Sequence, residues 1–280
     1  MNALLDCAAM PEPLPFETPA ADPIGVFDSG LGGLSVLRAL RRQLPQAPLR
    51  YLADSANAPY GDRSEAFIVE RSQRMARHLV AQGAKLLVVA CNTATAAAVA
   101  NLRERWPALP IVGVEPGLKP AAAATRNGRI GVLATTGTLR SEKFRQLLAR
   151  QGDAVQITAQ PCPGLADLIE RGALDTPELR AMVERCCAPL REAGVDTVVL
   201  GCTHYPFVQH LIADAMGPQV QIIDTADAVA RRAAQLWQAR GAADAAGDVV
   251  PLETTGDVAS LQRAAANWLP FRCEVTGSSA

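Results

Sequence analysis

The chain has 280 residues, of which 49% are hydrophobic and 20% are charged, and its formal net charge at pH 7 is -1. This composition predicts a globular protein with enough apolar side chains for one large domain or two ordinary ones. The near-zero charge argues against nucleic acid or an anionic membrane surface as the main partner. The apolar stretches are too short to span a membrane.

Cysteine usage and the first residues bear on the compartment. The seven cysteines are an odd number without CxxC spacing, which favours a reducing cytoplasm over secretion. Residues 1–23 contain Asp6, Glu12 and five prolines and lack an uninterrupted apolar stretch. They predict a flexible N-terminal extension and neither a signal peptide nor a membrane anchor.

From residue 24 onward, apolar strands alternate with amphipathic helices, the pattern of α/β proteins with parallel sheets. In the first part of the chain we expect strands at Ile24–Asp28, Arg50–Asp54, Leu86–Ala90 and Ile111–Val114. Helices are expected at Leu34–Leu44, Ser64–Gln82 and Ala94–Arg105.

The same alternation continues to about residue 254. The expected strands are Ile130–Ala134, Ala154–Ala159, Thr197–Leu200, Val220–Asp224 and, near the end, Val249–Thr254. The expected helices are Leu118–Thr125, Ser141–Gln151, Gly164–Arg171, Pro177–Ala193, Pro206–Met216 and Ala226–Arg240.

These elements predict two pseudo-symmetric α/β domains with mostly parallel sheets and an active site in the cleft between them. We assign residues 24–114 and about 226–270 to the first domain and 115–225 to the second. The last segment returns to the first domain because two-domain α/β proteins often pair their domains through crossed-over segments. Residues 271–280 are expected to form a tail.

Two pairs of segments support the internal repeat. Residues 87–93 and 198–204 each run an apolar strand into a cysteine followed by polar residues, at Cys91 and Cys202. Residues 24–30 and 130–136 match upstream of them at a similar offset. The pattern predicts one α/β unit used twice, with a thiol at the same place in each copy. Two thiols facing one cleft suit a reaction in which a proton leaves one face of a carbon and returns to the other.

Thiols at strand ends can be chemically active. A cysteine there, close to the amino end of the next helix, can have its pKa lowered below about 8.5, which supplies thiolate at neutral pH. A single buried cysteine is commonly a small core residue, and we assign that role to Cys7, Cys162, Cys186, Cys187 and Cys273. The matched positions of Cys91 and Cys202 favour a functional role for both.

Further polar residues follow the same strand ends. They are Asp28, Ser29, Asn92, Thr93, Thr135, Thr136, Thr138, Thr203 and His204. Such groups, together with backbone N–H groups at helix starts, suit a small zwitterion that carries two carboxylates. A lone Asp-Ser or Thr-Thr pair could also be an ordinary helix cap, and His204 could be a structural histidine with satisfied hydrogen bonds. His204, directly after Cys-Thr, is expected to orient the Cys202 thiol or to exchange a proton with it.

The sequence carries no cofactor signal. The glycines at 30, 32 and 33 break the G-x-G-x-x-G spacing of a dinucleotide loop, and no P-loop occurs. With three histidines in the chain, no His/Cys/Asp cluster has metal-ligand spacing, so no metal site is expected. None of the three lysines ends a strand in a polar motif, as a pyridoxal enzyme would need. Acid–base chemistry without a cofactor remains.

Four motifs together resemble the bacterial glutamate racemases of the aspartate/glutamate racemase family. They are Asp28-Ser29-Gly30-x-Gly32-Gly33, Pro59-Tyr60-Gly61, Cys91-Asn92-Thr93-Ala94 and Gly201-Cys202-Thr203-His204-Tyr205-Pro206. The resemblance covers about residues 24 to 225. It implies an isomerase that interconverts L- and D-glutamate without a cofactor and supplies D-glutamate for peptidoglycan.

The resemblance also implies residue roles. Cys91 would act as base on the D-enantiomer and Cys202 on the L-enantiomer, and Glu170 resembles an acidic residue that supports His204. The implied substrate-lining residues are Asp28, Ser29, Tyr60, Gly61, Asn92, Thr93, Thr203 and His204, with Thr135 and Thr138 as weaker matches. We expect a homodimer in the cytoplasm.

Two alternatives stay open on the sequence. A racemase for another acidic amino acid, such as aspartate, would carry the same paired thiols, although aspartate racemases usually have Glu at the position of His204. A non-catalytic amino-acid-binding protein would also have two α/β lobes around a cleft.

Overall fold

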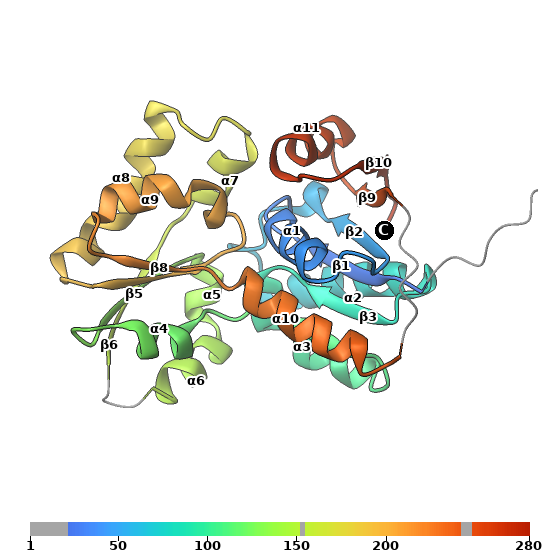
Figure 1. Cartoon of the computed structure of the whole chain (residues 1–280), viewed down its shortest axis with the longest axis horizontal. Coiled ribbons are helices and arrows are strands. Elements are labelled where there is room, and N and C mark those ends of the chain that lie inside the picture. The colour runs from blue at the N-terminus through green and yellow to red at the C-terminus, as the bar shows by residue number, and fades with distance from the viewer. Residues whose placement is uncertain (1–21, 152–154, 242–247) are drawn as a thin grey trace, which may run out of the picture.

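The computed structural model describes residues 22–151, 155–241 and 248–280 (Figure 1). The expected N-terminal extension lies outside the described residues except for Asp22 and Pro23. Two parallel sheets covered by helices form the molecule, which confirms the α/β class. Within the described part of the chain, no helix is both long and apolar enough to cross a membrane.

The first sheet has six parallel strands in the order β10-β9-β2-β1-β3-β4. Their bounds are β1 (Ile24–Asp28), β2 (Leu49–Ala53), β3 (Leu86–Val89), β4 (Ile111–Gly113), β9 (Val250–Thr254) and β10 (Cys273–Gly277). Every residue of β1 and β3 is buried, as expected for strands covered on both faces.

The second sheet has four parallel strands in the order β6-β5-β7-β8. Their bounds are β5 (Arg129–Ala134), β6 (Gln156–Pro161), β7 (Thr197–Gly201) and β8 (Gln221–Ile223). The order 6-5-7-8 repeats the order 2-1-3-4 of the first sheet, so the repeat expected from the sequence is present in the topology. Cys91 follows β3 and Cys202 follows β7, which are equivalent strands.

Helices join the parallel strands, as crossover connections between parallel strands usually do. In chain order they are α1 (Leu34–Gln43), α2 (Glu65–Ala81), α3 (Asn92–Arg105), α4 (Leu118–Ala124), α5 (Thr136–Arg140), α6 (Glu142–Ala149), α7 (Leu165–Glu170), α8 (Pro177–Glu192), α9 (Gln209–Met216), α10 (Ala226–Gln238) and α11 (Val258–Trp268). Short 3-10 helices lie at η1 (Ser55–Asn57) and η3 (Tyr205–Val208). Helix α10, orange in Figure 1, packs against α1 of the first sheet.

The structure differs from the sequence prediction most near the end of the chain. Residues 271–280 were expected as a tail, but β10 is the edge strand of the first sheet, and α11, which was not predicted, precedes it. No residue of β10 is fully buried, so this edge strand lacks the apolar run by which the other strands were recognised. Helix α5 also escaped prediction because it has only five residues.

The two domains touch away from the strand ends as well. Phe207 of η3 stacks on Trp268 of α11 with ring centroids 3.9 Å apart, so an element of the second domain contacts an unpredicted helix of the first.

Candidate active site

Cys91 and Cys202 line one pocket between the two sheets. Cys91 caps the amino end of α3 and accepts a hydrogen bond from the Ala94 N–H at 3.4 Å, while Cys202 follows the last residue of β7. Both are buried and carry free thiols. The pocket is small, about 30 Å³, which is room for one or two water molecules.

On the Cys91 side, a serine and an aspartate form a chain of contacts. The Ser29 Oγ lies 3.4 Å from the Cys91 Sγ and donates to the Asp28 Oδ1 at 3.3 Å. The Asp28 carboxylate also accepts from the N–H groups of Ser29 and Gly33, at 2.7 Å and 2.6 Å. Burial raises the pKa of Asp28, against the lowering effect of the His204 charge and these hydrogen bonds. A carboxylate with a raised pKa is a better proton acceptor, so a thiol proton has a route through Ser29 to Asp28.

On the Cys202 side, the contacts run through a histidine and a glutamate. The Cys202 Sγ lies 3.5 Å from the His204 Nδ1, and the His204 Nε2 lies 2.7 Å from the Glu170 Oε1. Burial alone would lower the pKa of His204, but its hydrogen bonds to Cys202 and Glu170 raise it well above 6.5. Burial opposes ionisation of Glu170 as well, yet the hydrogen bond from His204 lowers the pKa of Glu170 below its usual value. These shifts favour an imidazolium at His204 paired with an ionised Glu170, and in that form both ring N–H groups are donors.

The pKa of Cys91 contradicts the sequence expectation. Burial, followed by the charge of Asp28, raises the pKa of the Cys91 thiol, although the hydrogen bonds with Ser29 and Ala94 act to lower it. One weak contact at the helix terminus does not offset complete burial beside a carboxyl group. In this closed site, Cys91 rests as a thiol and is ready to donate a proton.

Of the glycines at 30, 32 and 33, whose spacing differs from that of a dinucleotide loop, the first two allow close packing against the second domain. The loop from Ser29 to Gly33 passes directly over the second domain, where the Leu31 N–H donates to the Glu170 Oε1 at 2.7 Å. A Cβ on Gly30 would overlap the carboxylate of Glu170, and a Cβ on Gly32 would overlap the ring of His204. The absence of side chains at these positions lets the loop hold the partners of Cys202 in place.

Substitution of Gly32 by alanine therefore tests the loop. We expect Gly32→Ala to push the His204 ring away from Cys202 and to lower the rate of the reaction that uses the thiols at least about tenfold, or about 1.4 kcal/mol. Gly277→Ala is the matched control, because its Cβ would meet only an ordinary contact at 3.7 Å. Wild-type initial rates for Gly32→Ala would show that the loop does not constrain His204.

Hydroxyl groups join the domains beside the cysteines. The Thr93 Oγ1 lies 2.9 Å from the Thr135 Oγ1 and 3.2 Å from the Thr138 Oγ1, and the Gly137 N–H donates to the Gly61 carbonyl at 2.9 Å. All three contacts link the first domain to the second. Gly61, Thr93 and Thr135 also line the pocket, so these contacts lie at its edge.

Asn92 presents an unpaired amide to the site. Its side-chain oxygen and nitrogen are both buried, and within the described residues neither has a hydrogen-bond partner. Asn92 lines the pocket beside Cys91. A buried amide without partners is costly, and a polar ligand would satisfy it.

The structure brings most of the predicted site residues to the pocket. Those that line it are Ser29, Tyr60, Gly61, Cys91, Asn92, Thr93, Thr135, Glu170, Cys202, Thr203 and His204. Asp28 and Thr138 lie behind this lining, in contact with Ser29 and with the threonines. Asp167 also lines the pocket and was missed. It lies one helical turn before Glu170 on α7, and that spacing is the signal that could have revealed it.

The remaining described cysteines, Cys162, Cys186, Cys187 and Cys273, do not line this pocket. Across residues 22–151, 155–241 and 248–280, no cluster of three or more His, Cys, Asp or Glu side chains could hold a metal ion. The pocket brings together two thiols, each with its own acid–base partners.

Comparisons with known proteins agree with this arrangement. The family model of Asp/Glu/hydantoin racemases matches residues 24–233. A glutamate racemase of Pseudomonas aeruginosa is 57% identical over 217 residues, which cover 78% of this chain and 82% of that protein. A glutamate racemase of Pseudomonas putida is 50% identical over 257 residues, covering 91% and 96%.

Solved structures give the same result. The glutamate racemase RacE1 of Bacillus anthracis superposes with a TM-score of 0.85 at 35% identity, covering 93% of this chain and 98% of that one. The Escherichia coli glutamate racemase, solved with L-glutamate and the activator UDP-MurNAc-Ala, has a TM-score of 0.81 at 33% identity, covering 91% and 98%.

Proposed function

The chain belongs to the Asp/Glu/hydantoin racemase family, and we propose that it interconverts L-glutamate and D-glutamate through Cys91 and Cys202 without a cofactor. The single observation that carries the proposal is that equivalent strands of two equally ordered sheets deliver one thiol each to one pocket. The product D-glutamate would supply peptidoglycan synthesis.

The proposed reaction moves one proton off the α-carbon and another onto it. With L-glutamate, the Cys202 thiolate takes the α-proton, and the electron pair of the broken C–H bond stays on the α-carbon. The Cys91 thiol then gives its proton to the opposite face, which forms D-glutamate and leaves a Cys91 thiolate. D-glutamate reacts by the reverse sequence. The raised pKa of Cys91 favours its protonated starting state in the L-to-D direction.

Each thiol has partners that can reset it. The protonated His204, held by Glu170, faces the sulfur of Cys202 and supports negative charge there. Ser29 and Asp28 offer Cys91 a proton acceptor when it must act as base. These partners exchange protons with the sulfurs between turnovers and do not touch the α-carbon. Asn92 and Thr93 of the first domain, with Thr135 and Thr203 of the second, would hold the amino and carboxylate groups.

The size of the pocket makes opening part of the cycle. Pockets that enclose small organic ligands occupy roughly 300 Å³ or more, about ten times the volume found here. Glutamate therefore enters only when the Gly61–Gly137 and Thr93–Thr135 contacts part, and closure around it excludes water from the reacting carbon.

Circular dichroism of the purified chain with L-glutamate, without added cofactor, tests the function. We expect the signal of L-glutamate to decay to zero as the racemate forms. Faster decay with L-aspartate would identify a racemase for another acidic amino acid. Tight binding of L-glutamate with a constant signal would identify an amino-acid-binding protein.

Deuterium labelling tests the use of two thiols. In D2O, newly formed D-glutamate should carry deuterium at the α-carbon, because its proton comes from a thiol that has exchanged with solvent. L-glutamate recovered at low conversion should stay protiated, because the abstracted proton remains on the other sulfur. Mass spectrometry of the separated enantiomers measures both. Early deuterium in the L-glutamate pool would instead indicate a single base that serves both faces.

The compartment and the oligomer are further expectations. All six described cysteines are free thiols, which fits the proposed cytoplasmic location. The homodimer stays a prediction, and light scattering of the purified chain measures it.

A further inference from the structure

The loop between β2 and α2 carries two residues of the pocket, Tyr60 and Gly61. In the pocket, the Gly61 carbonyl of this loop accepts a hydrogen bond from the Gly137 N–H of the second domain. The position of this loop therefore affects both the pocket wall and the contact that closes the domains. The side chains that hold the loop from its other side, Asp54 and Arg71, do not line the pocket.

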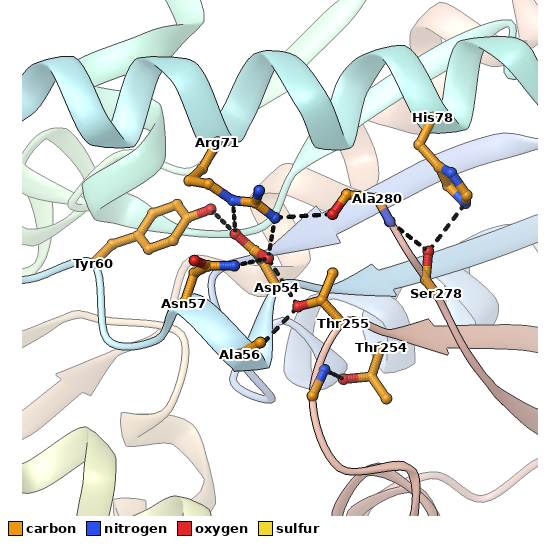
Figure 2. Close-up of polar contacts among 11 residues, drawn as sticks. Asp54, Ala56, Asn57, Tyr60, Arg71, His78, Thr254, Thr255, Ser278 and Ala280 are labelled. Carbon is orange, nitrogen blue, oxygen red and sulfur yellow. Dashed lines mark hydrogen bonds and ion pairs between the residues drawn. The ribbon is translucent and has the colours of Figure 1, made fainter.

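One buried carboxylate accepts hydrogen bonds from two residues of the loop and so fixes its conformation. Asp54, fully buried at the start of the loop, accepts hydrogen bonds from the Tyr60 hydroxyl at 2.5 Å and from the Asn57 amide at 2.9 Å (Figure 2). The Thr255 hydroxyl, which follows β9, donates to it at 2.9 Å. Burial and the charge of Asp54 raise the pKa of Tyr60, so its hydroxyl remains a donor at any physiological pH.

Arg71 of α2 completes this arrangement. Its Nε and Nη2 donate to the two carboxylate oxygens of Asp54 at 2.9 Å and 2.7 Å, and the side chain is nearly buried. A buried carboxylate needs such a partner, because an unpaired charge in the core is strongly destabilising. The planar fork of arginine meets both oxygens at once, which the single ammonium group of lysine cannot do.

A segment far away in the sequence also reaches Arg71. Residues 278–280 follow β10, and the backbone oxygen of Ala280 accepts from the Arg71 Nη2 at 3.1 Å (Figure 2). Ser278 fixes this segment, since its N–H donates to the Thr254 carbonyl at 2.7 Å and its hydroxyl accepts from the Ala280 N–H. Ala280 packs against the same apolar cluster that contains Tyr60 and Cys91. We name residues 278–280 the strap.

We propose that Arg71 is a positioning residue for the amino acid site: with Asp54 it sets Tyr60 and the Gly61 carbonyl, and the strap holds Arg71 from behind. Arg71 touches neither the thiols nor the pocket. Its loss should weaken substrate binding and domain closure more than it slows proton transfer. The proposal rests on the proposed glutamate site but does not require that the bound glutamate be racemised.

Four variants test it, with KM and kcat from racemisation and Kd for L-glutamate from calorimetry. We expect Tyr60→Phe, which removes only the hydroxyl held by Asp54, to raise Kd and KM about tenfold while kcat changes less than about threefold. Arg71→Met should raise Kd and KM at least as much as Tyr60→Phe does, and Arg71→Lys should raise them less than Arg71→Met. Deletion of residues 278–280 should raise Kd about threefold. Arg74→Met, on an exposed position of the same helix, is the control and should match the wild type.

A double variant separates positioning from general loss of stability. If Arg71 acts through Asp54 on Tyr60, Arg71→Met combined with Tyr60→Phe should raise Kd no further than Arg71→Met alone. If the two substitutions instead multiply their effects on Kd in the double variant, the proposal is overturned. A wild-type Kd in a folded Arg71→Lys or Tyr60→Phe protein would overturn it as well. Arg71→Met is read only in its folded fraction, measured by thermal melting. A wild type that binds L-glutamate without racemising it refutes the proposed function alone, and one that binds no acidic amino acid refutes both.

Discussion

Cys91→Ser and Cys202→Ser are each expected to lower racemisation at least about 1,000-fold, or about 4 kcal/mol of barrier, without loss of the fold. A serine hydroxyl is far less acidic than a thiol, so it neither takes the α-proton at neutral pH nor restores the missing proton donor. Each variant keeps one intact thiol with its partners, Ser29 and Asp28 or His204 and Glu170. L-glutamate should still bind to both.

Cys273→Ser is the matched control for the thiol variants, because Cys273 lies on β10, does not line the pocket and is only partly buried. It should racemise L-glutamate at the wild-type rate. Polarimetry gives the rates, and calorimetry with L-glutamate shows that the site is intact. Residual kcat above about a tenth of the wild-type value in either thiol variant would refute the assignment of one thiol to each face.

Asp28→Asn and His204→Asn are expected to lower turnover about 100-fold, strongly but less than loss of a thiol. The reason is that these residues change the protonation of the sulfurs and do not exchange a proton with the substrate. Asp28→Asn removes the acceptor at the end of the Ser29 contact, and His204→Asn removes the donor that faces Cys202. Steady-state rates in both directions measure the loss. Wild-type turnover in both variants would show that Asp28 and His204 have only structural roles.

The pH dependence of Glu170→Gln tests the same side of the site. The carboxylate of Glu170 helps to hold the pKa of His204 well above its ordinary value. Without that charge, burial is opposed mainly by the contact with Cys202, so the pKa of His204 falls and the imidazolium is lost at lower pH. We therefore expect the alkaline limb of kcat/KM to move to lower pH in Glu170→Gln. Glu178→Gln, an exposed glutamate on α8, should leave it in place. An unchanged alkaline limb in Glu170→Gln would show that Glu170 does not control His204.

Those parts of the fold that depend on local apolar pattern were predictable from the sequence. The strands that present Asp28, Cys91 and Cys202 are short apolar runs that end in polar residues, and parallel topology places such ends at one edge. β10, with the sequence CEVTG, has no such run, and the segment 271–280 was misread as a tail for that reason.

Features that depend on burial and on contacts between domains were not predictable. The sequence shows Cys91 at a helix start but not that its thiol is buried beside Asp28, so the direction of its pKa was wrong. The Arg71–Asp54 pair joins residues of α2 and the loop before it, and neither belongs to a recognisable motif. Glycine is needed at positions 30 and 32 because Glu170 and His204, which are distant in the sequence, pack directly against them, and the sequence does not show this contact.

The two thiols have unlike partners, a serine and a carboxyl group for Cys91 and an imidazolium–carboxylate pair for Cys202. The substrate and product, however, are mirror images of equal free energy in water, so their equilibrium constant is one. The ratio of kcat/KM in the two directions must equal that constant, in the wild type and in every variant. The asymmetry of the site can therefore appear only in kcat and KM separately. A defect in the Asp28 or His204 half that lowers kcat/KM for one enantiomer must lower kcat/KM for the other by the same factor. Although the two halves of the site differ chemically, thermodynamics therefore requires the same kcat/KM for L-glutamate and D-glutamate.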